Sequence, residues 1–298
     1  MKKPLIVSIV NHKGGVGKTT VTLNLAASLD MMLNKKKKAN KKILIIDNDA
    51  QANITAVLED DYLDLEENET IARIYQGKPD FSRDIIKKCD RFNNVYYVPS
   101  IYLIEHLRDA LLSKYDGMFM LRFFIEQICG DFDLILIDNR PDFSIYTKNS
   151  MVVADFVVIP TSPETLSLIG IQQIIDNIEQ VKHINPGIQI LGVLINMVNK
   201  IKLGHKRNRY KLYKGFGELV FNTEIHEAAA ISNAIDVKKS VLEYNLTARA
   251  HKEFLDLAKE SLFRLGFSDI KYNEEEALNR RMKEEIKLEK EAAKGRAK

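Results

Sequence analysis

A short segment near the start of the chain combines the residue types that hold a phosphate group. It reads Asn-His-Lys-Gly-Gly-Val-Gly-Lys-Thr-Thr over residues 11–20, after an apolar run and before a helical pattern. Glycines let backbone N–H groups turn inward around an anion, and a helix that begins there directs its positive end at the same anion. In such a loop the final lysine contacts the outer phosphates of a nucleotide, and the next hydroxyl binds Mg²⁺. We therefore expect Lys18 to contact phosphates and Thr19 to bind the metal.

Two further segments place carboxylates directly after apolar runs. Asp138 follows the run 134–137, and Asp47 and Asp49 follow the run 43–46. An acid directly after a buried strand is the form of a Walker B motif, in which it holds the metal that neutralises phosphate charge. The sequence therefore predicts Asp138 as a magnesium ligand. For Asp49 the residues also allow a structural interpretation, in which the two acids cap a helix.

Six short apolar runs must position these groups. They lie at residues 5–10, 43–46, 95–98, 134–137, 156–159 and 190–195, with amphipathic segments between several of them. That alternation predicts an α/β fold with a mostly parallel twisted sheet and helices on both faces. Because ligands bind beyond the carboxyl ends of such strands, the loop 11–20 and the two acidic segments are expected at one edge.

The length of 298 residues fits one large α/β domain with appendages. We expect a single domain over residues 1–271 and a charged tail over 272–298, in which Glu blocks alternate with Lys and Arg; the tail is predicted to be helical or disordered and solvated. A lysine run at residues 35–38 is assigned to solvent.

The net charge of +3 is small, so any affinity for nucleic acid must come from clustered cations.

Neither a secretory signal nor a membrane span is expected. The apolar run 5–10 is too short for a signal-peptide core, and no stretch approaches the roughly 20 apolar residues that cross a bilayer. Cys89 and Cys129 are far apart and lack metal-ligand spacing. We interpret both as reduced thiols of a cytoplasmic protein.

Residues 13–20 resemble the deviant Walker A loop of the ParA/MinD superfamily of P-loop ATPases. The resemblance implies ATP and Mg²⁺ as cofactors, and it covers roughly residues 3–266. It also implies that Lys13 reaches across a homodimer interface to the ATP of the partner subunit, so that nucleotide binding and dimerisation are coupled. The expected ATP-binding residues in the loop are Lys13, Gly14, Gly15, Val16, Gly17, Lys18, Thr19 and Thr20.

The same resemblance extends to three later segments. Residues 45–53 are similar to the family's switch segment, which implies that Asp49 positions the attacking water and belongs with Thr19 and Asp138 to the magnesium site. Asn196 ends a run similar to the strand whose asparagine contacts adenine in relatives. Lys13, Lys18, Asp49 and Asp138 are thus the expected catalytic residues of a slow, partner-stimulated ATPase. Asn139 and Arg140 depart from the family pattern beside the γ-phosphate, and their effect on hydrolysis is left open.

The superfamily contains several functional classes, which the rest of the chain helps to separate. Cys89 and Cys129 lack the context of a shared iron–sulfur cluster, and one tyrosine in the tail does not make a self-phosphorylating kinase tail. A MinD-like protein that positions cargo on a membrane or protein scaffold remains the alternative. The tail offers Leu278, Met282 and Ile286 among many charges, which favours a solvated or self-packing helix, so no membrane binding is expected.

The favoured interpretation is a ParA-type partition ATPase. Its ATP-driven homodimer would bind non-specific DNA, associate with the nucleoid and be released by a ParB-like partner that stimulates hydrolysis. A patch of cations with nearby tyrosines can neutralise phosphates without reading sequence. A solvated loop and helix face is the alternative for the same residues. The candidate DNA contacts are Lys200, Lys202, Lys206, Arg207, Arg209, Lys211, Lys238, Lys239 and Arg249.

Overall fold

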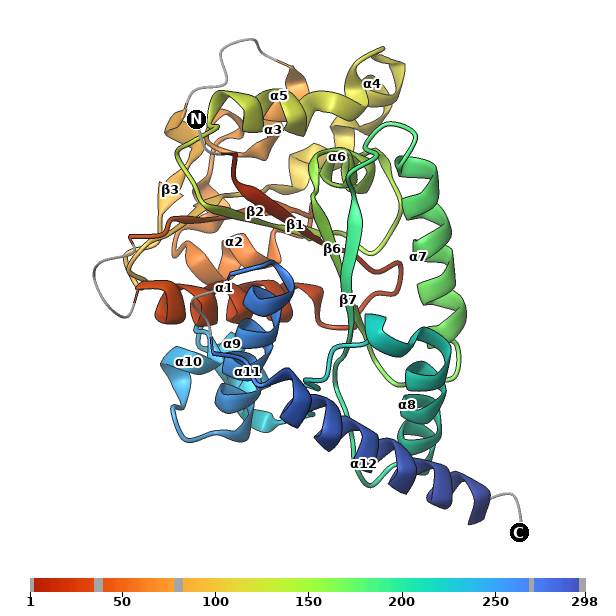
Figure 1. The fold of residues 1–298 in the computed structure, drawn as a ribbon. Helices are drawn as coiled ribbons and strands as arrows, with labels where there is room; N and C mark the ends of the chain where they lie inside the picture. Colours follow the sequence, from red (N-terminus) through yellow and green to blue (C-terminus); the bar gives the residue numbers. More distant parts are fainter. Residues whose placement is uncertain (1–2, 35–39, 78–82, 268–270, 295–298) are drawn as a thin grey trace.

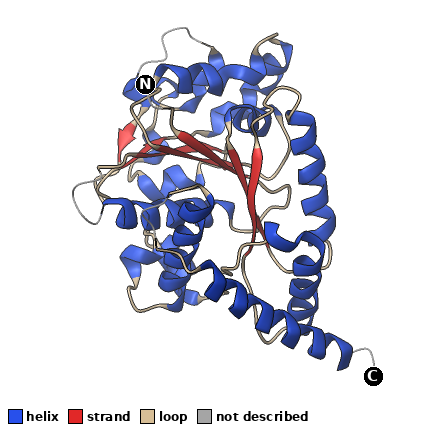
Figure 2. Ribbon diagram, viewed as in Figure 1, coloured by secondary structure: helices blue, strands red, loops and turns tan. Residues whose placement is uncertain are grey.

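A seven-stranded sheet forms the centre of the molecule, as Figures 1 and 2 show for this computed structural model. The structure describes residues 3–34, 40–77, 83–267 and 271–294, so the lysine run at 35–38 lies outside the described residues. The strand order is β3-β4-β2-β5-β1-β6-β7. The strands are β1 (Leu5–Ile9), β2 (Ile43–Asn48), β3 (Lys87–Lys88), β4 (Val95–Val98), β5 (Leu134–Asn139), β6 (Phe156–Thr161) and β7 (Gln189–Ile195).

The mostly parallel sheet predicted from the sequence is confirmed. All pairings are parallel except that of β3 with β4, and β3 is the strand that the sequence analysis missed. β3 is only two residues long and consists of lysines, so it carries no apolar pattern. In β2 and β5 every residue is buried, because helices cover both faces of a parallel sheet.

Each face of the sheet has its own hydrophobic core. Along β2, Ile43 and Ile45 face one core whereas Leu44 and Ile46 face the other, as the two-residue period of a strand requires. The first core is covered by α1 (Lys18–Asn34), α2 (Asn53–Leu58), α9 (Ala229–Asp236), α10 (Val241–Tyr244) and α11 (Arg249–Arg264). The second is covered by α3 (Ile71–Gln76), α4 (Arg108–Ser113), α5 (Met120–Gln127), α6 (Ile145–Val153), α7 (Ser167–Val181) and α8 (Leu203–Phe216).

The C-terminal tail forms a helix that packs on the domain. α12 (Glu274–Lys294) lies against α8 and crosses it near the bottom of Figure 1. Leu288 is only 1% exposed, and Arg281 donates hydrogen bonds to the carbonyl oxygens of Val220 and Gly217. The expectation of a solvated tail is therefore wrong for this face of the helix. The division into a domain of residues 1–271 and a tail of 272–298 stays a prediction.

Among the described residues, no helix combines the length and the apolar character that crossing a bilayer requires. Both cysteines are free thiols: Cys89 is buried behind β4, and Cys129 is partly exposed after α5. In the part of the chain that the structure describes, no group of three or more His, Cys, Asp or Glu side chains is arranged to hold a metal ion.

Candidate nucleotide site

The glycine loop joins the carboxyl end of β1 to the start of α1. Gly15 and Gly17 have φ angles of +72° and +84°, which glycine adopts freely and other residues rarely do. A Cβ atom on Gly17 would lie 2.4 Å from Nδ2 of Asn196, so the close approach of the chain there also requires glycine. α1 begins at Lys18, and its first turn directs unpaired N–H groups toward the loop. This geometry can hold phosphate oxygens.

Lys18 lies beside a group of carboxylates at the base of the loop. Its side chain is largely buried, and burial lowers the pKa of its amine, while Asp138, Asp49 and Asp142 interact with it electrostatically and oppose that shift. Nζ of Lys18 lies 3.5 Å from the carbonyl oxygen of Lys13. The lysine is therefore held inside the loop, where it can meet a phosphate.

Thr19 and Asp138 form the candidate magnesium site. The Thr19 hydroxyl donates a hydrogen bond of 2.7 Å to Oδ2 of Asp138, and the Thr22 hydroxyl donates one of 3.0 Å to Oδ1. Burial, with a smaller effect of Asp47, raises the pKa of Asp138 to about 7. A hydroxyl and a carboxylate oxygen are hard ligands that suit Mg²⁺, which usually takes its other ligands from phosphates and water. The residues present therefore fit a magnesium ion.

Asp47 and Asp49 have different environments although they are two residues apart. Asp47 is fully buried and accepts hydrogen bonds from N–H and Oγ1 of Thr55 at 2.9 and 2.7 Å, and burial raises its pKa to about 6. Asp49 interacts electrostatically with Lys18, and its Oδ1 accepts a hydrogen bond from the N–H of Gln51. Asp47 is thus held by Thr55, whereas Asp49 lies near Lys18 of the glycine loop.

Asn139, the last residue of β5, and Arg140, which follows it, depart from the family pattern and also have separate roles. Asn139 is buried; its amide donates to Oγ of Ser8 at 2.9 Å, and its oxygen accepts from Asn48 at 2.8 Å. The Arg140 guanidinium pairs with Glu105 and Asp142, each at 2.5 Å. Asn139 therefore joins neighbouring strands, and Arg140 ties the segment after β5 to the segment before α4.

Lys13 and Asn196 have different surroundings. The Lys13 amine forms an ion pair with Glu164, and its side chain is 49% exposed. Asn196 is buried and donates a hydrogen bond of 2.8 Å to the carbonyl oxygen of Val16. Asn196 also borders a cavity of about 410 Å³ whose other walls include Thr20, Met197, His226, Glu227, Ala228, Ala229, Ile231 and Ser232. A base could enter this cavity while its phosphates lie in the loop.

Sequence reasoning missed several supporting residues. Thr22 lies one helical turn beyond Lys18 and so could have been found from its position on the same side of α1. The hydroxyl of Tyr75 donates to Oδ1 of Asn48, and Thr55 holds Asp47. No spacing rule links these two residues to the loop, because they come from α3 and α2.

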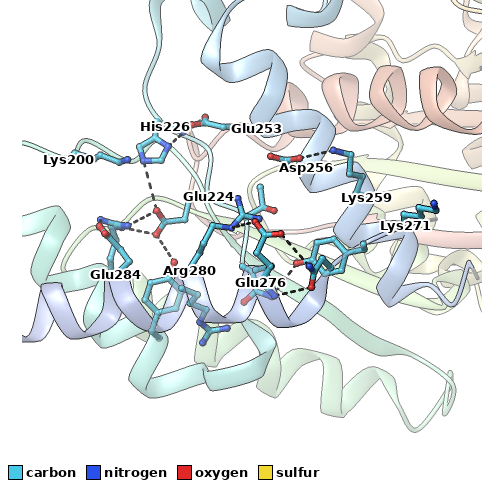
Figure 3. Close-up of a pocket in the computed structure, with 18 residues that line it drawn as sticks. Lys200, Glu224, His226, Glu253, Asp256, Lys259, Lys271, Glu276, Arg280 and Glu284 are labelled. Atoms are coloured by element: carbon cyan, nitrogen blue, oxygen red, sulfur yellow. Dashed lines mark hydrogen bonds and ion pairs between the residues drawn. The ribbon is translucent and has the colours of Figure 1, made fainter.

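The proposed DNA-binding cations do not form one free surface. Arg209 is only 2% exposed and makes a two-pronged ion pair with Glu224, with hydrogen bonds of 2.7 and 2.6 Å, and a further one of 3.2 Å with Glu284. It lines a polar cavity of about 460 Å³ between α8, α11 and α12, in which Glu224, Glu284 and Lys200 are labelled in Figure 3. Arg209 is thus removed from the candidate DNA contacts, because its charge is satisfied inside the protein.

The other candidates vary in their surroundings. Lys206 pairs with Glu291, Lys202 with Glu227, and Arg249 with Glu253. The amine of Lys238 donates to the carbonyl oxygens of Glu59 and Asp60. Four further candidates are exposed: Lys200, Arg207, Lys211 and Lys239.

Comparison with known proteins places the chain in a family. A family model described as an AAA domain matches residues 4–190. The sporulation initiation inhibitor protein Soj of Bacillus subtilis is 31% identical over 257 residues, which cover 86% of this chain and 97% of Soj. The chromosome-partitioning ATPase Soj of Thermus thermophilus is 27% identical over 268 residues, covering 87% and 96%.

A solved structure agrees with the fold. The septum site-determining protein MinD of Pyrococcus horikoshii, complexed with Mg-ADP, matches with a TM-score of 0.67 and 23% identity, covering 88% of this chain and 98% of MinD. The family match spans more than half of the 298 residues, and the loop, Lys18, Thr19 and Asp138 come together at one edge of the sheet. The chain therefore belongs to the ParA/MinD family of P-loop ATPases.

Proposed function

We propose that this chain is a DNA-segregation ATPase in which ATP and Mg²⁺ join two copies into a homodimer that binds DNA without sequence preference. The observation that carries the proposal is the position of Lys13. Its half-exposed side chain pairs with Glu164 before α7, whereas Lys18 of the same loop interacts electrostatically with carboxylates from other segments, among them Asp138 and Asp49. Lys13 is therefore available for the phosphates of a partner subunit's nucleotide, where a second cation would stabilise the transferring phosphoryl group.

The chemistry of this site is mainly the placement of charge. Thr19 and Asp138 would hold Mg²⁺, which neutralises negative charge on the phosphates, while Lys18 contacts the β and γ phosphates. Asp49 would orient the attacking water, since it lies near Lys18 and is not locked in a buried pair as Asp47 is. Asn196 and the cavity beside it would receive the base. Hydrolysis would be slow until a ParB-like partner stimulates it.

DNA binding is proposed for the exposed cations around α8 and α9. Lys200, Arg207, Lys211 and Lys239 are exposed and lie on segments near the nucleotide edge of the domain. Cations of this kind neutralise backbone phosphates and give salt-sensitive binding. The chromosome-partitioning activity in the name of the Thermus thermophilus relative supports this proposal. Association with the nucleoid would follow from ATP-dependent DNA binding.

The experiment is a binding titration with a non-specific DNA duplex. It compares protein without nucleotide, with ADP, with ATP and with a slowly hydrolysed ATP analogue, at two salt concentrations. We expect tight, salt-sensitive binding only with ATP or the analogue, and the Lys13→Gln variant should lose the ATP-dependent part. Absence of DNA binding in every nucleotide state would overturn the proposal.

A second candidate function is MinD-like positioning of cargo on a membrane or scaffold. It is favoured by the similarity to the septum site-determining protein MinD and by the exposed side chains of Leu278, Met282 and Ile286 on α12. These residues are four apart and so share one helix face. Co-sedimentation with anionic vesicles in ATP tests it. Vesicle binding without DNA binding would replace the first proposal with this one.

A further inference from the structure

The acidic residues of α12 are directed at α8. Oε1 of Glu284 accepts a hydrogen bond of 3.2 Å from Arg209, and Oε1 of Glu289 accepts one of 2.8 Å from the Tyr210 hydroxyl. Glu291 forms an ion pair of 2.9 Å with Lys206. The tail thus neutralises two of the cations that the sequence offered for DNA binding, and it does so with carboxylates from successive turns of one helix.

The lysines of α12 lie on a different side of the helix. Lys283, Lys287 and Lys290 are exposed, and none of them forms an ion pair within the part of the chain that the structure describes. Lys287 interacts electrostatically with Glu291, whose pKa is lowered mainly by its hydrogen bond with Lys206. Their spacing of four and three residues keeps them on one face. We call these three residues the lysine row. α12 therefore covers cations of α8 and presents its own cations to solvent.

The dimensions of the lysine row suit a nucleic-acid backbone. Its two ends, Lys283 and Lys290, are seven positions apart, which corresponds to about 10 Å along a helix axis at about 1.5 Å per residue. One DNA strand presents a phosphate about every 3.4 Å along the duplex axis, so about three phosphates fall within that length. Lysine is a point charge on a flexible stem, which suits contact with phosphates without sequence preference.

Two more free lysines border the same region. Arg280, one turn before the lysine row, lines the polar cavity of Figure 3 together with Lys200 and Lys271. Lys200 and Lys271 are exposed and have no ion-pair partner among the described residues. Carboxylates that line this cavity are already paired: Glu224 with Arg209, Glu253 with Arg249, and Asp256 with Lys259. The unpaired charge at this rim is therefore positive.

We propose that the lysine row of α12, continued by Lys200 and Lys271 at the cavity rim, is a second surface that contacts the phosphates of duplex DNA. The proposal rests on the DNA-binding function proposed above and adds the C-terminal helix to it. Burial of Arg209 and pairing of Lys206 make these two residues of α8 unavailable to DNA. The lysines of the tail would then supply DNA affinity in their place.

The pattern of α12 favours DNA over a membrane as the occupant. A helix that lies in a membrane interface needs a continuous apolar face with cations beside it. On α12, Glu275 and Glu289 fall on the same side as the exposed Leu278 and Met282, since they are three to seven residues from them. Burying those carboxylates in the acyl region would be costly. The three positions of the lysine row are all cations, and Glu291, which lies one turn after Lys287, is paired with Lys206.

The test compares three triple variants of the full chain for binding to a non-specific duplex in ATP across a salt series. K283Q/K287Q/K290Q removes the lysine row, and K283R/K287R/K290R keeps its charge. K88Q/K114Q/K182Q is the matched control, since it removes the same charge from exposed or partly exposed positions at β3, after α4 and at the end of α7. Thermal unfolding and ATP-dependent dimerisation of each variant check that the fold is intact.

We expect K283Q/K287Q/K290Q to weaken DNA binding by at least about tenfold and to lower the salt slope by roughly 2 to 3, because each lost phosphate contact lowers it by about 0.9. The arginine variant and the control should stay near wild type. Equal binding by K283Q/K287Q/K290Q and the control would overturn this inference while leaving the proposed function intact. A wild type that binds no DNA would overturn both, and loss of anionic-vesicle binding alone would assign the row to a membrane.

Discussion

The nucleotide edge of the sheet and the unit formed by α8 and α12 relate to the sequence in opposite ways. At the nucleotide edge, Asp138 lies near the carboxyl end of β5 and Thr19 lies in the first turn of α1, after the loop that follows β1. The parallel pairing of β1 with β5 brings these two ends together, and the Thr19 hydroxyl lies 2.7 Å from Asp138. In the α8–α12 unit, Arg209 pairs with Glu224 at 2.7 and 2.6 Å and donates a further hydrogen bond of 3.2 Å to Glu284, 75 positions later. Residue type and spacing therefore predict a site that forms at the ends of neighbouring strands. They do not reveal which cations will form ion pairs with a helix that is distant in the sequence.

The largest expected effect is at the nucleotide edge. Lys13→Gln should lower ATP hydrolysis by about a thousandfold, because a cation supplied across an interface to the transferring phosphoryl group contributes at that scale. The affinity of the monomer for nucleotide should change less than about twofold, because the Lys13 amine pairs with Glu164 and is not expected to contact the phosphates bound by its own subunit. Single-turnover hydrolysis and equilibrium binding measure the two quantities.

Lys18→Gln is the matched variant, because Lys18 lies inside the same loop. It should lose nucleotide affinity as well as hydrolysis. Hydrolysis by Lys13→Gln at the wild-type rate would contradict the role of Lys13 in the partner's site.

The next effect concerns stability in the α8–α12 unit. Arg209→Ala should lower the free energy of unfolding by about 3 to 5 kcal/mol, because it leaves the buried carboxylate of Glu224 without its cation. Lys211→Ala, on the exposed side of α8, should change it by less than about 0.5 kcal/mol. Urea unfolding followed by circular dichroism measures both. Similar losses for the two variants would mean that Arg209 is not the internal anchor of α12.

Some parts of the fold and of the candidate site could be predicted from the sequence, and others could not. The six longer strands and the convergence of the loop with Asp138 followed from apolar runs and from the rule for parallel sheets. The two-residue β3 and the supporting Tyr75 and Thr55 did not, because short lysine pairs and single polar residues carry no periodic signal. The packing of α12 was missed because its buried Leu288 and Arg281 lie among charges that resemble a solvated helix.

A smaller effect is expected from pH at the magnesium site. In the proposed site the ionised form of Asp138 would bind Mg²⁺, and its pKa of about 7 means that protons would compete for this carboxylate near neutral pH. Magnesium affinity in the presence of ADP should therefore fall as pH decreases below about 7, by at most about tenfold per pH unit. Titration between pH 6 and 8 measures it, after correction for protonation of the nucleotide.

Asp138→Asn provides the control for that titration. It should bind Mg²⁺ weakly and show little of the pH dependence, because the amide does not titrate. A pH dependence equal to that of the wild type would place the titrating group elsewhere, for example at Asp47, whose pKa is raised to about 6 by burial.

The smallest effect is expected at Arg140. Here the nucleotide edge resembles the α8–α12 unit, because each contains an arginine that pairs with two carboxylates. Like Arg209, Arg140 is held by two carboxylates, Glu105 and Asp142, but it follows the proposed magnesium ligand Asp138 by only two residues and interacts electrostatically with Asp49. Arg140→Gln should lower hydrolysis by less than about tenfold and leave ATP affinity nearly unchanged, because it loosens the segment that positions Asp49 without touching the phosphate loop.

Glu105→Gln separates the two possible reasons for such a loss. It releases Arg140 from the segment before α4 but leaves the cation beside Asp142 and Asp49. If the charge of Arg140 is what matters, Glu105→Gln should hydrolyse ATP at nearly the wild-type rate while Arg140→Gln is slow. If both variants lose the same activity, Arg140 acts by tying two segments together, as Arg209 does between α8 and α12.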